Sequence, residues 1–150
     1  MSLSLDLEGI KKYHRARPPM LLIDEAYDIV PGQSAKAIKK LSKDEWFFSG
    51  HFPQEPVMPG VLQMEAIAQT AALAIHTMPG NEDKTSYLSR IIDAKCFFKV
   101  VPGDVLYIEA NVDSWRHGLG KGHGVLLVRE KIACKASFVI IIEDELLKGR

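Results

Sequence analysis

The chain has 150 residues, enough for one domain and too few for two of ordinary size, so we expect a single domain over residues 1–150 with a short helical lead-in over residues 1–16. Its 19 basic and 19 acidic side chains give a formal net charge of zero, which provides no overall field to attract nucleic acid or an anionic membrane. A composition of 47% hydrophobic and 25% charged residues is typical of a globular, soluble protein.

The N-terminal part of the chain alternates short apolar runs with turn signals. Residues 7–19 (LEGIKKYHRARPP) predict a short helix that the two prolines stop. Residues 20–30 (MLLIDEAYDIV) predict a strand that ends at the turn PGQS, and residues 35–42 (AKAIKKLS) predict a second strand. Residues 43–60 contain too much Gly and Pro for regular structure. We expect a long ordered loop there, a kind of segment that often carries function.

One long helix is predicted over residues 61–78 (VLQMEAIAQTAALAIHTM), because Ala, Leu and Met are strong helix formers. Pro59 and Gly60 precede it, where proline suits the first turn, and Pro79 and Gly80 stop it. Apolar residues surround the helix almost completely, so we expect it to be buried on most sides. The polar residues inside this segment argue against a transmembrane span, and the N-terminus lacks the pattern of a signal peptide. Both observations favour the cytoplasm, or an organelle if a transit peptide was removed.

The remainder of the chain has the pattern of strands. Residues 87–101 and 105–115 each predict one strand, and the glycine-rich residues 116–124 predict a turn between strands rather than a phosphate-binding loop. Residues 125–144 predict one or two further strands, with a break near residues 129–131. Without a regular βαβ alternation the fold class is α+β. A single apolar helix wrapped by one curved antiparallel sheet satisfies this order of elements.

Isolated cysteines and histidines outside the loop give little indication of chemistry. Cys96 and Cys134 lie among apolar residues with no partner at metal spacing, so we expect two buried, reduced thiols. Packing or solvated roles are expected for the four histidines without ligand spacing, which are His14, His76, His117 and His123. We also expect the aromatic run Trp46, Phe47 and Phe48 to belong to the core.

The predicted loop contains His51, which is a candidate general base. A lone loop histidine is more often structural or solvated. Here the neighbouring aromatic residues, Phe52 among them, would exclude water, and three prolines would hold the loop. A partly desolvated imidazole stays neutral near pH 7 and can accept a proton.

A second candidate is Glu65, which lies within the apolar helix. A buried carboxylate is costly unless it is paired, and burial favours a protonated carboxyl that can donate a proton. Gln69, one turn further on, could orient this carboxyl. Alternatively, both residues form a polar stripe that faces solvent. The backbone N–H groups after Gly60 lack helical partners and could bind a developing oxyanion. A base, an acid and an oxyanion site are the parts needed to remove a proton next to a carbonyl and then lose a β-hydroxyl.

The segment GHFPQEPVMPGVLQMEAIAQ closely resembles the signature of the 3-hydroxyacyl-[acyl-carrier-protein] dehydratases of type II fatty acid synthesis, and the likeness extends over residues 17–142. The resemblance implies a hot-dog fold and a homodimer, often assembled into a trimer of dimers. It implies His51 and Glu65 as the catalytic pair, contributed by opposite subunits, and Gly60 as the residue that holds the thioester carbonyl. Supporting positions in the matching segment are Phe52, Pro59, Val61 and Gln69. The resemblance also implies that the acyl chain arrives on the phosphopantetheine arm of acyl carrier protein and that no metal or other cofactor is needed.

Three positions depart from the family pattern. Gln54 and Glu55 stand where a glycine and a variable residue are common, Phe98 replaces a usual arginine, and Ala16 replaces a histidine. These changes bear on the carrier and on the acyl chain, and they leave the proposed chemistry in place. The alternatives are a hot-dog acyl thioesterase and a non-catalytic acyl-binding subunit. The first is disfavoured by the GHFP loop, and the second by the presence of both His51 and Glu65.

Overall fold

The computed structural model describes residues 2–142. Seven strands and two helices follow one another in these residues as β1 Leu3–Leu5, α1 Leu7–Tyr13, β2 Glu25–Val30, β3 Ser34–Lys40, α2 Gly60–His76, β4 Ser86–Cys96, β5 Val105–Arg116, β6 Leu119–Val128 and β7 Lys131–Ile142. The strand predicted to run to residue 144 has its last two residues outside the described part of the chain. β1 is a short strand that the sequence pattern did not predict.

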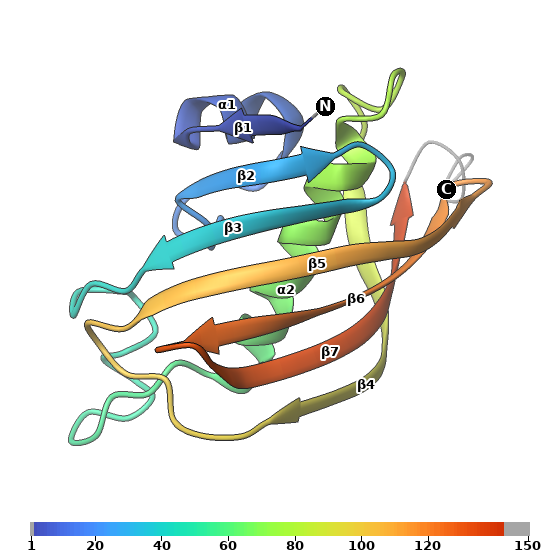
Figure 1. Ribbon diagram of the computed structural model, residues 1–150. Helices are drawn as coiled ribbons and strands as arrows, with labels where there is room; N and C mark the ends of the chain where they lie inside the picture. The colour runs from blue at the N-terminus through green and yellow to red at the C-terminus, as the bar shows by residue number, and fades with distance from the viewer. Residues whose placement is uncertain (1, 143–150) are drawn as a thin grey trace.

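All seven strands belong to one antiparallel sheet in the order β1-β2-β3-β5-β6-β7-β4. The sheet is curved, and α2 lies against one of its faces, behind the strands in the view of Figure 1. β4, which follows α2 in sequence, pairs with β7 and forms one outer edge of the sheet. The predicted α+β hot-dog architecture, one long helix wrapped by a curved antiparallel sheet, is confirmed.

The helix α2 is buried over most of its length, as predicted. Every residue from Ala66 to His76 is buried, whereas the first turn, which includes Gly60 and Val61, is partly or largely exposed. Burial of this apolar surface against β3, β5, β6 and β7 supplies the main stabilising contribution to the core. The same arrangement leaves the N-terminal end of α2 accessible.

The glycine-rich segment proves to be a strand, so the prediction of a turn over residues 116–124 is wrong for most of its length. Only His117 and Gly118, both at positive φ, make the turn between β5 and β6. A Cβ atom on Gly124 would lie 2.5 Å from the Glu109 carbonyl oxygen and 2.7 Å from Cγ2 of Ile67 in α2. Glycine is therefore needed at this point of β6 because both the β5 backbone and a side chain of α2 occupy the space of a Cβ atom. The predicted break at residues 129–131 is confirmed, with a turn between β6 and β7.

The apolar run before β2 is buried without being a strand. The strand predicted from residue 20 begins only at Glu25, although Leu21, Leu22 and Ile23 are all nearly inaccessible to solvent. The side-chain amide of Gln69 replaces a neighbouring strand here, because it accepts a hydrogen bond from the Leu22 N–H. A buried apolar run whose backbone N–H bonds to a side chain has the same sequence pattern as a buried strand. The strand was therefore predicted to begin too early.

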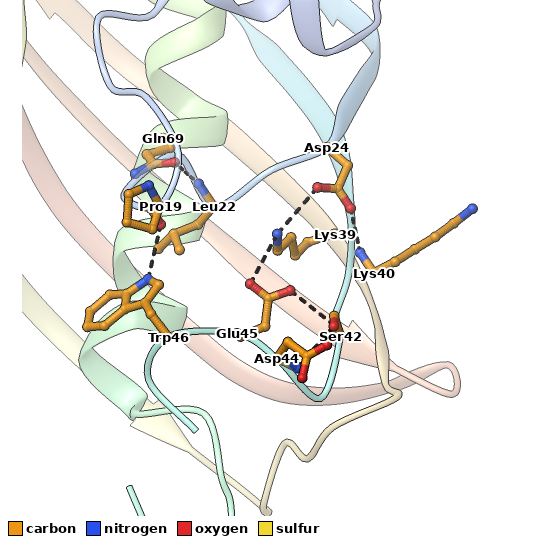
Figure 2. Close-up of polar contacts among 10 residues, drawn as sticks. All are labelled: Pro19, Leu22, Asp24, Lys39, Lys40, Ser42, Asp44, Glu45, Trp46 and Gln69. Atoms are coloured by element: carbon orange, nitrogen blue, oxygen red, sulfur yellow. Dashed lines mark hydrogen bonds and ion pairs between the residues drawn. The ribbon is translucent and has the colours of Figure 1, made fainter. Parts of the chain in front are cut away.

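The long loop before α2 is tied to the rest of the domain by polar contacts that Figure 2 shows. Nζ of Lys39 lies 3.4 Å from a carboxylate oxygen of Asp24 and 3.6 Å from one of Glu45. Lys39 thus joins β3 to the segment before β2 and to the loop before α2. The Trp46 indole N–H donates to the Pro19 carbonyl. Trp46 is 47% exposed, so its predicted place in the core is wrong, whereas Phe47 and Phe48 are buried as predicted.

The two cysteines face each other across β4 and β7. Cys96 and Cys134 are direct partners in the register of these strands, and both thiols are free. Cys134 is fully buried, but Cys96 is exposed, so the prediction of two buried thiols is wrong for Cys96. Its place at the end of the edge strand accounts for the exposure.

Candidate active site

The loop that carries His51 is held by a set of backbone hydrogen bonds. The His51 N–H donates to the Phe47 carbonyl, and the Val57 N–H donates to the His51 carbonyl. Phe52 and Glu55 exchange two further hydrogen bonds, which close a tight turn at the tip of the loop. The peptide bond between His51 and Phe52 is cis. The backbone around His51 is thus fixed by its own contacts as well as by the prolines.

The imidazole of His51 has a defined tautomer. Nδ1 lies 3.1 Å from the Val57 carbonyl oxygen. A carbonyl only accepts, so Nδ1 must carry a proton, and Nε2 of the neutral ring is left with a free lone pair. The ring stacks on Phe52 with centroids 4.2 Å apart. Phe52 is 53% exposed, so within one chain it does not exclude water from the imidazole as predicted.

α2 begins at Gly60 with Pro59 as its N-cap, as the sequence predicted to within one residue. No side chain caps this end of the helix, and its first turn contains no acidic residue. Its free N–H groups and the helix dipole can therefore stabilise a negatively charged oxygen. Gly60 packs closely against a neighbour, because an added Cβ would lie 2.9 Å from Sγ of Cys96. Val61, in the same turn, is 67% exposed.

The carboxyl of Glu65 is held by Gln69, one turn along α2. Nε2 of Gln69 donates to Oε2 of Glu65 at 2.8 Å. Gln69 is itself fixed by the 18–24 segment, since it accepts from the Leu22 N–H at 2.9 Å and donates to the Met20 carbonyl at 2.8 Å (Figure 2 shows the first of these). Of the two arrangements the sequence left open, a solvent-facing polar stripe is not observed, since Gln69 is buried and hydrogen-bonded to the half-buried Glu65.

Burial raises the pKa of the Glu65 carboxyl above its ordinary value, and the hydrogen bond from Gln69 offsets part of this rise. A carboxyl in this state is a better proton donor near neutral pH than an exposed glutamate is. The environment of Glu65 therefore suits a general acid.

A small cavity of about 30 Å³ lies beside Glu65, with a volume close to that of one water molecule. The cavity is lined by His14, Glu65, Ala68, Gln69, Ala72, Ser86, Tyr87, Leu88 and Ile140. His51 is not among these residues. His51 and Glu65 are thus not brought into one cavity within a single chain.

His14 and His76 form a buried pair, and His14 also lines the cavity beside Glu65. Their rings lie 6.2 Å apart, and the expected packing roles fit their burial. His76 bridges the Asn81 carbonyl and the Ser86 hydroxyl. Burial lowers the pKa of His14 to about 4 and also lowers the pKa of His76, so both rings are neutral near pH 7. No spacing in the sequence indicated that His14 would reach the cavity beside Glu65.

The unusual residues of the loop also have partners. Glu55 forms an ion pair with Lys99, which links the tip of the His51 loop to the segment after β4. Phe98, which stands beside Lys99, is 39% exposed and lines a surface cavity of about 410 Å³ with Val101, Arg129 and Lys131 among its other lining residues. The acidic side chain at position 55 is therefore balanced by a neighbouring cation.

Two further findings concern residues 2–142 alone. Within this range there is no group of three or more His, Cys, Asp or Glu side chains arranged to hold a metal ion. None of the helices in this range is both long enough and apolar enough to cross a membrane.

Comparison with known proteins gives concordant results. The model of the FabA-like domain matches residues 15–137. The chain is 44% identical over 139 residues to the 3-hydroxyacyl-[acyl-carrier-protein] dehydratase FabZ of Ligilactobacillus salivarius, covering 92% of this chain and 99% of that protein. It is 39% identical over 141 residues to the protein of the same name from Oceanobacillus iheyensis, and the match covers 93% of this chain and 99% of that protein. Among solved structures, an uncharacterized protein from Pyrococcus horikoshii shares the fold with a TM-score of 0.63 at 14% identity, over 87% of this chain and 90% of that one.

Proposed function

The chain belongs to the FabA-like family, and from this premise we propose that it dehydrates (3R)-3-hydroxyacyl thioesters on acyl carrier protein to trans-2-enoyl thioesters, a step of fatty acid biosynthesis. The observation that carries the proposal is the state of two side chains. The hydrogen bond from Nδ1 of His51 to the Val57 carbonyl leaves Nε2 as the ring nitrogen that can accept a proton, and Glu65 has a half-buried carboxyl held in place by Gln69. Both residues lie within the matched residues 15–137.

The reaction assigns one role to each part of the site. Nε2 of His51 removes a proton from C2 of the substrate, and negative charge develops on the thioester oxygen. The Gly60 N–H and the dipole of α2 stabilise this oxygen. Glu65 donates its proton to the C3 hydroxyl, the C3–O bond breaks, and water leaves as the C2–C3 double bond forms. His51 ends protonated and Glu65 ionised, so one proton must return from His51 to Glu65 before the next turnover.

The other matched residues support these three. Gln69 positions the carboxyl of Glu65, and Phe52 stacks on the imidazole of His51. Pro59 sets the start of α2, and the exposed Val61 offers apolar surface to an acyl chain or to a second subunit.

We further propose that the working unit is a homodimer in which His51 of one chain meets Glu65 of the other. Two observations support this arrangement. The cavity beside Glu65 has no contribution from His51. β4 lies at an edge of the sheet and exposes Tyr87, Ile91 and Ile92. An edge strand with exposed apolar side chains is a natural surface for pairing with a second copy. A trimer of such dimers and a cytoplasmic location complete the proposal.

The test is complementation between two inactive variants, His51→Ala and Glu65→Ala. Each variant alone should lose nearly all formation of enoyl thioester, which is followed by its ultraviolet absorbance. The two variants are mixed in equal amounts, unfolded and reassembled. About half of the dimers are then mixed, and each mixed dimer has one intact site of two, so about a quarter of the wild-type activity should return. Mixed dimers that form but stay inactive would contradict the shared site.

The same assay separates the dehydratase from the thioesterase alternative. A dehydratase converts the 3-hydroxyacyl thioester to the enoyl thioester without releasing a free thiol, whereas a thioesterase releases a thiol and forms no enoyl group. A wild-type protein that binds the substrate but does neither would be a non-catalytic subunit, and the proposal would be wrong. Parallel reactions with acyl carrier protein and coenzyme A thioesters identify the carrier.

A further inference from the structure

The ring of His14 has a defined tautomer and a buried N–H. The Ala16 N–H donates to Nδ1 at 3.2 Å, so Nδ1 carries a lone pair and the neutral ring carries its proton on Nε2. Burial lowers the pKa of His14 to about 4, which keeps the ring neutral near pH 7. Nε2 is buried and has no hydrogen-bond partner among residues 2–142. A buried donor of this kind is normally paired, either with a protein group or with an ordered water.

The cavity beside Glu65 offers a place for such a water. Its volume of about 30 Å³ fits one water molecule, and His14 and Glu65 both line it. His14 is only 8% exposed, and its Nδ1 is turned toward the Ala16 N–H, so Nε2 is the ring nitrogen that can reach the cavity. A buried water also needs about two to four polar partners.

Ser86 supplies a second partner on the wall of this cavity. Nδ1 of His76 lies 3.0 Å from the Asn81 carbonyl oxygen, which only accepts, so Nδ1 carries the proton of that neutral ring. Nε2 of His76 must then accept, and the Ser86 hydroxyl 2.8 Å away is its donor. The proton of Ser86 is thereby committed, and its oxygen is left as an acceptor.

The third partner is the carboxyl of Glu65. Gln69 donates to Oε2 at 2.8 Å, which leaves Oε1 for other partners. A carboxylate oxygen has two lone-pair sites, so a water on Oε1 still leaves room for the C3 hydroxyl of the proposed substrate. A water molecule has two lone pairs and two protons, which suit one donor, His14, and two acceptors, Ser86 and Glu65.

We propose that this cavity is a binding site for one ordered water, which accepts a hydrogen bond from Nε2–H of His14 and donates to Oγ of Ser86 and Oε1 of Glu65. His14 is then a positioning residue, because it acts on Glu65 through the water and does not touch the substrate. This inference deepens the proposed function and rests on it for the role of Glu65 as the acid. The water holds Oε1 as Gln69 holds Oε2, so the carboxyl is fixed at both oxygens.

The water also affects the proton of Glu65. Its hydrogen bond stabilises the carboxylate that remains once the proton has been donated, so it offsets part of the rise in pKa that burial causes. Tyr87 of β4, 45% exposed, is the remaining titratable side chain that lines the cavity. His76 lies behind Ser86, and the proposed homodimer adds His51 of the partner subunit. Besides burial, the positive charges of Arg17 and Arg15 help to keep His14 and His76 neutral, respectively.

A high-resolution crystal structure of the assembled protein tests the water site without any measurement of activity. We expect one water in the cavity, at about 2.7–3.2 Å from Nε2 of His14 and at a similar distance from Oγ of Ser86. A cavity without a water, or one filled by a side chain of the second subunit, would overturn the proposal.

His14→Met and His14→Gln form a matched pair for the positioning role. Both lose the hydrogen bond from the Ala16 N–H, and only glutamine keeps a donor where Nε2 stands. For the 3-hydroxyacyl thioester, His14→Met should lower kcat by about two- to tenfold, the loss expected for one hydrogen bond. Its alkaline limb of kcat should move up by about half to one pH unit, because the ionised Glu65 loses a donor.

KM should stay the same in both variants, since the water does not contact the substrate, and His14→Gln should keep the kcat and the alkaline limb of the wild type. Equal values of kcat and equal alkaline limbs in the two variants would overturn the positioning role. A wild-type protein without dehydratase activity would refute the proposed function, while the crystal structure would still decide whether the water is bound.

Discussion

Replacing Gln69 by methionine tests whether this residue positions Glu65. The two side chains have similar volume, so the change removes hydrogen bonds and leaves little empty space. Three bonds are lost. The Leu22 N–H loses its acceptor, and the Met20 carbonyl and the Glu65 carboxyl each lose a donor. The variant should therefore be less stable and should hold Glu65 less well.

The stability loss follows from the burial of the groups left unpaired. Leu22 is 1% exposed, and an unsatisfied buried N–H costs about 1–3 kcal/mol. Met20 is 44% exposed, so water can replace most of its lost bond, at a cost below about 1 kcal/mol. Together these give about 1–4 kcal/mol. For a chain of this size that corresponds to a fall in Tm of roughly 2–16 °C.

The effect on Glu65 is read from the pH dependence of dehydration. The hydrogen bond from Gln69 lowers the pKa of Glu65, so its loss should raise this pKa further. Glu65 must be protonated to act as the acid, so the alkaline limb of the kcat profile should move to higher pH. kcat should also fall, because the carboxyl is no longer oriented.

Gln63→Met is the matched control. Gln63 is a second buried glutamine of α2, and it donates to the Met58 carbonyl and makes no bond to Glu65. This variant should be destabilised without any shift of the alkaline limb. A folded Gln69→Met protein whose limb stays at the wild-type pH would refute the positioning role.

Three further predictions concern stability. Gly124→Ala should lower the free energy of unfolding by about 1–3 kcal/mol, because its Cβ would lie 2.5 Å from the Glu109 carbonyl oxygen of β5 and 2.7 Å from Ile67 of α2. Gly50→Ala, with open space around it, should change this free energy by less than about 0.5 kcal/mol, and equal losses in urea titrations would be evidence against these close approaches at Gly124. Burial lowers the pKa of His14 from 6.5 to about 4 in the folded chain, so the unfolded chain binds more protons between these pH values. The free energy of unfolding should therefore fall by up to about 3 kcal/mol as the pH drops from 6.5 to 4. His14→Leu should flatten this pH dependence, and an unchanged dependence would show that His14 is not its cause. Lys99→Glu should lower the free energy of unfolding by less than about 1 kcal/mol, because it removes an exposed ion pair. The double variant Lys99→Glu/Glu55→Lys should regain this free energy, and high salt should abolish the difference between the single variant and the wild type. A loss that persists at high salt would show that the ion pair is not its cause.

The active-site segment was largely predictable because its signals are local. Proline and glycine at positions 59 and 60 start a helix wherever they precede strong helix formers, and α2 begins there. A glutamate one turn before a glutamine places their side chains within reach of each other on any helix, and the bond between Glu65 and Gln69 follows from that spacing.

The errors arose where the chain meets distant residues. Gly124 suggested a turn because glycine weakens an isolated strand, and the approach of the β5 backbone and of α2 makes its missing side chain an advantage. Leu22 suggested a strand because its partner, the amide of Gln69, lies 47 positions away. The exposure of Cys96 and its contact with Gly60 depend on which strand forms the edge of the sheet.

Local signals in the sequence thus predict the α+β class, the long apolar helix and the candidates for the base, the acid and the oxyanion-binding helix end, because helix propensity, turn chemistry and the cost of burying a carboxyl act over a few residues. Tertiary structure alone decided the tautomer of His51, the anchoring of Gln69, the burial of His14 beside Glu65 and the position of Cys96. These depend on distances between atoms far apart in the chain, which the packing of α2 against the sheet sets and no local pattern encodes.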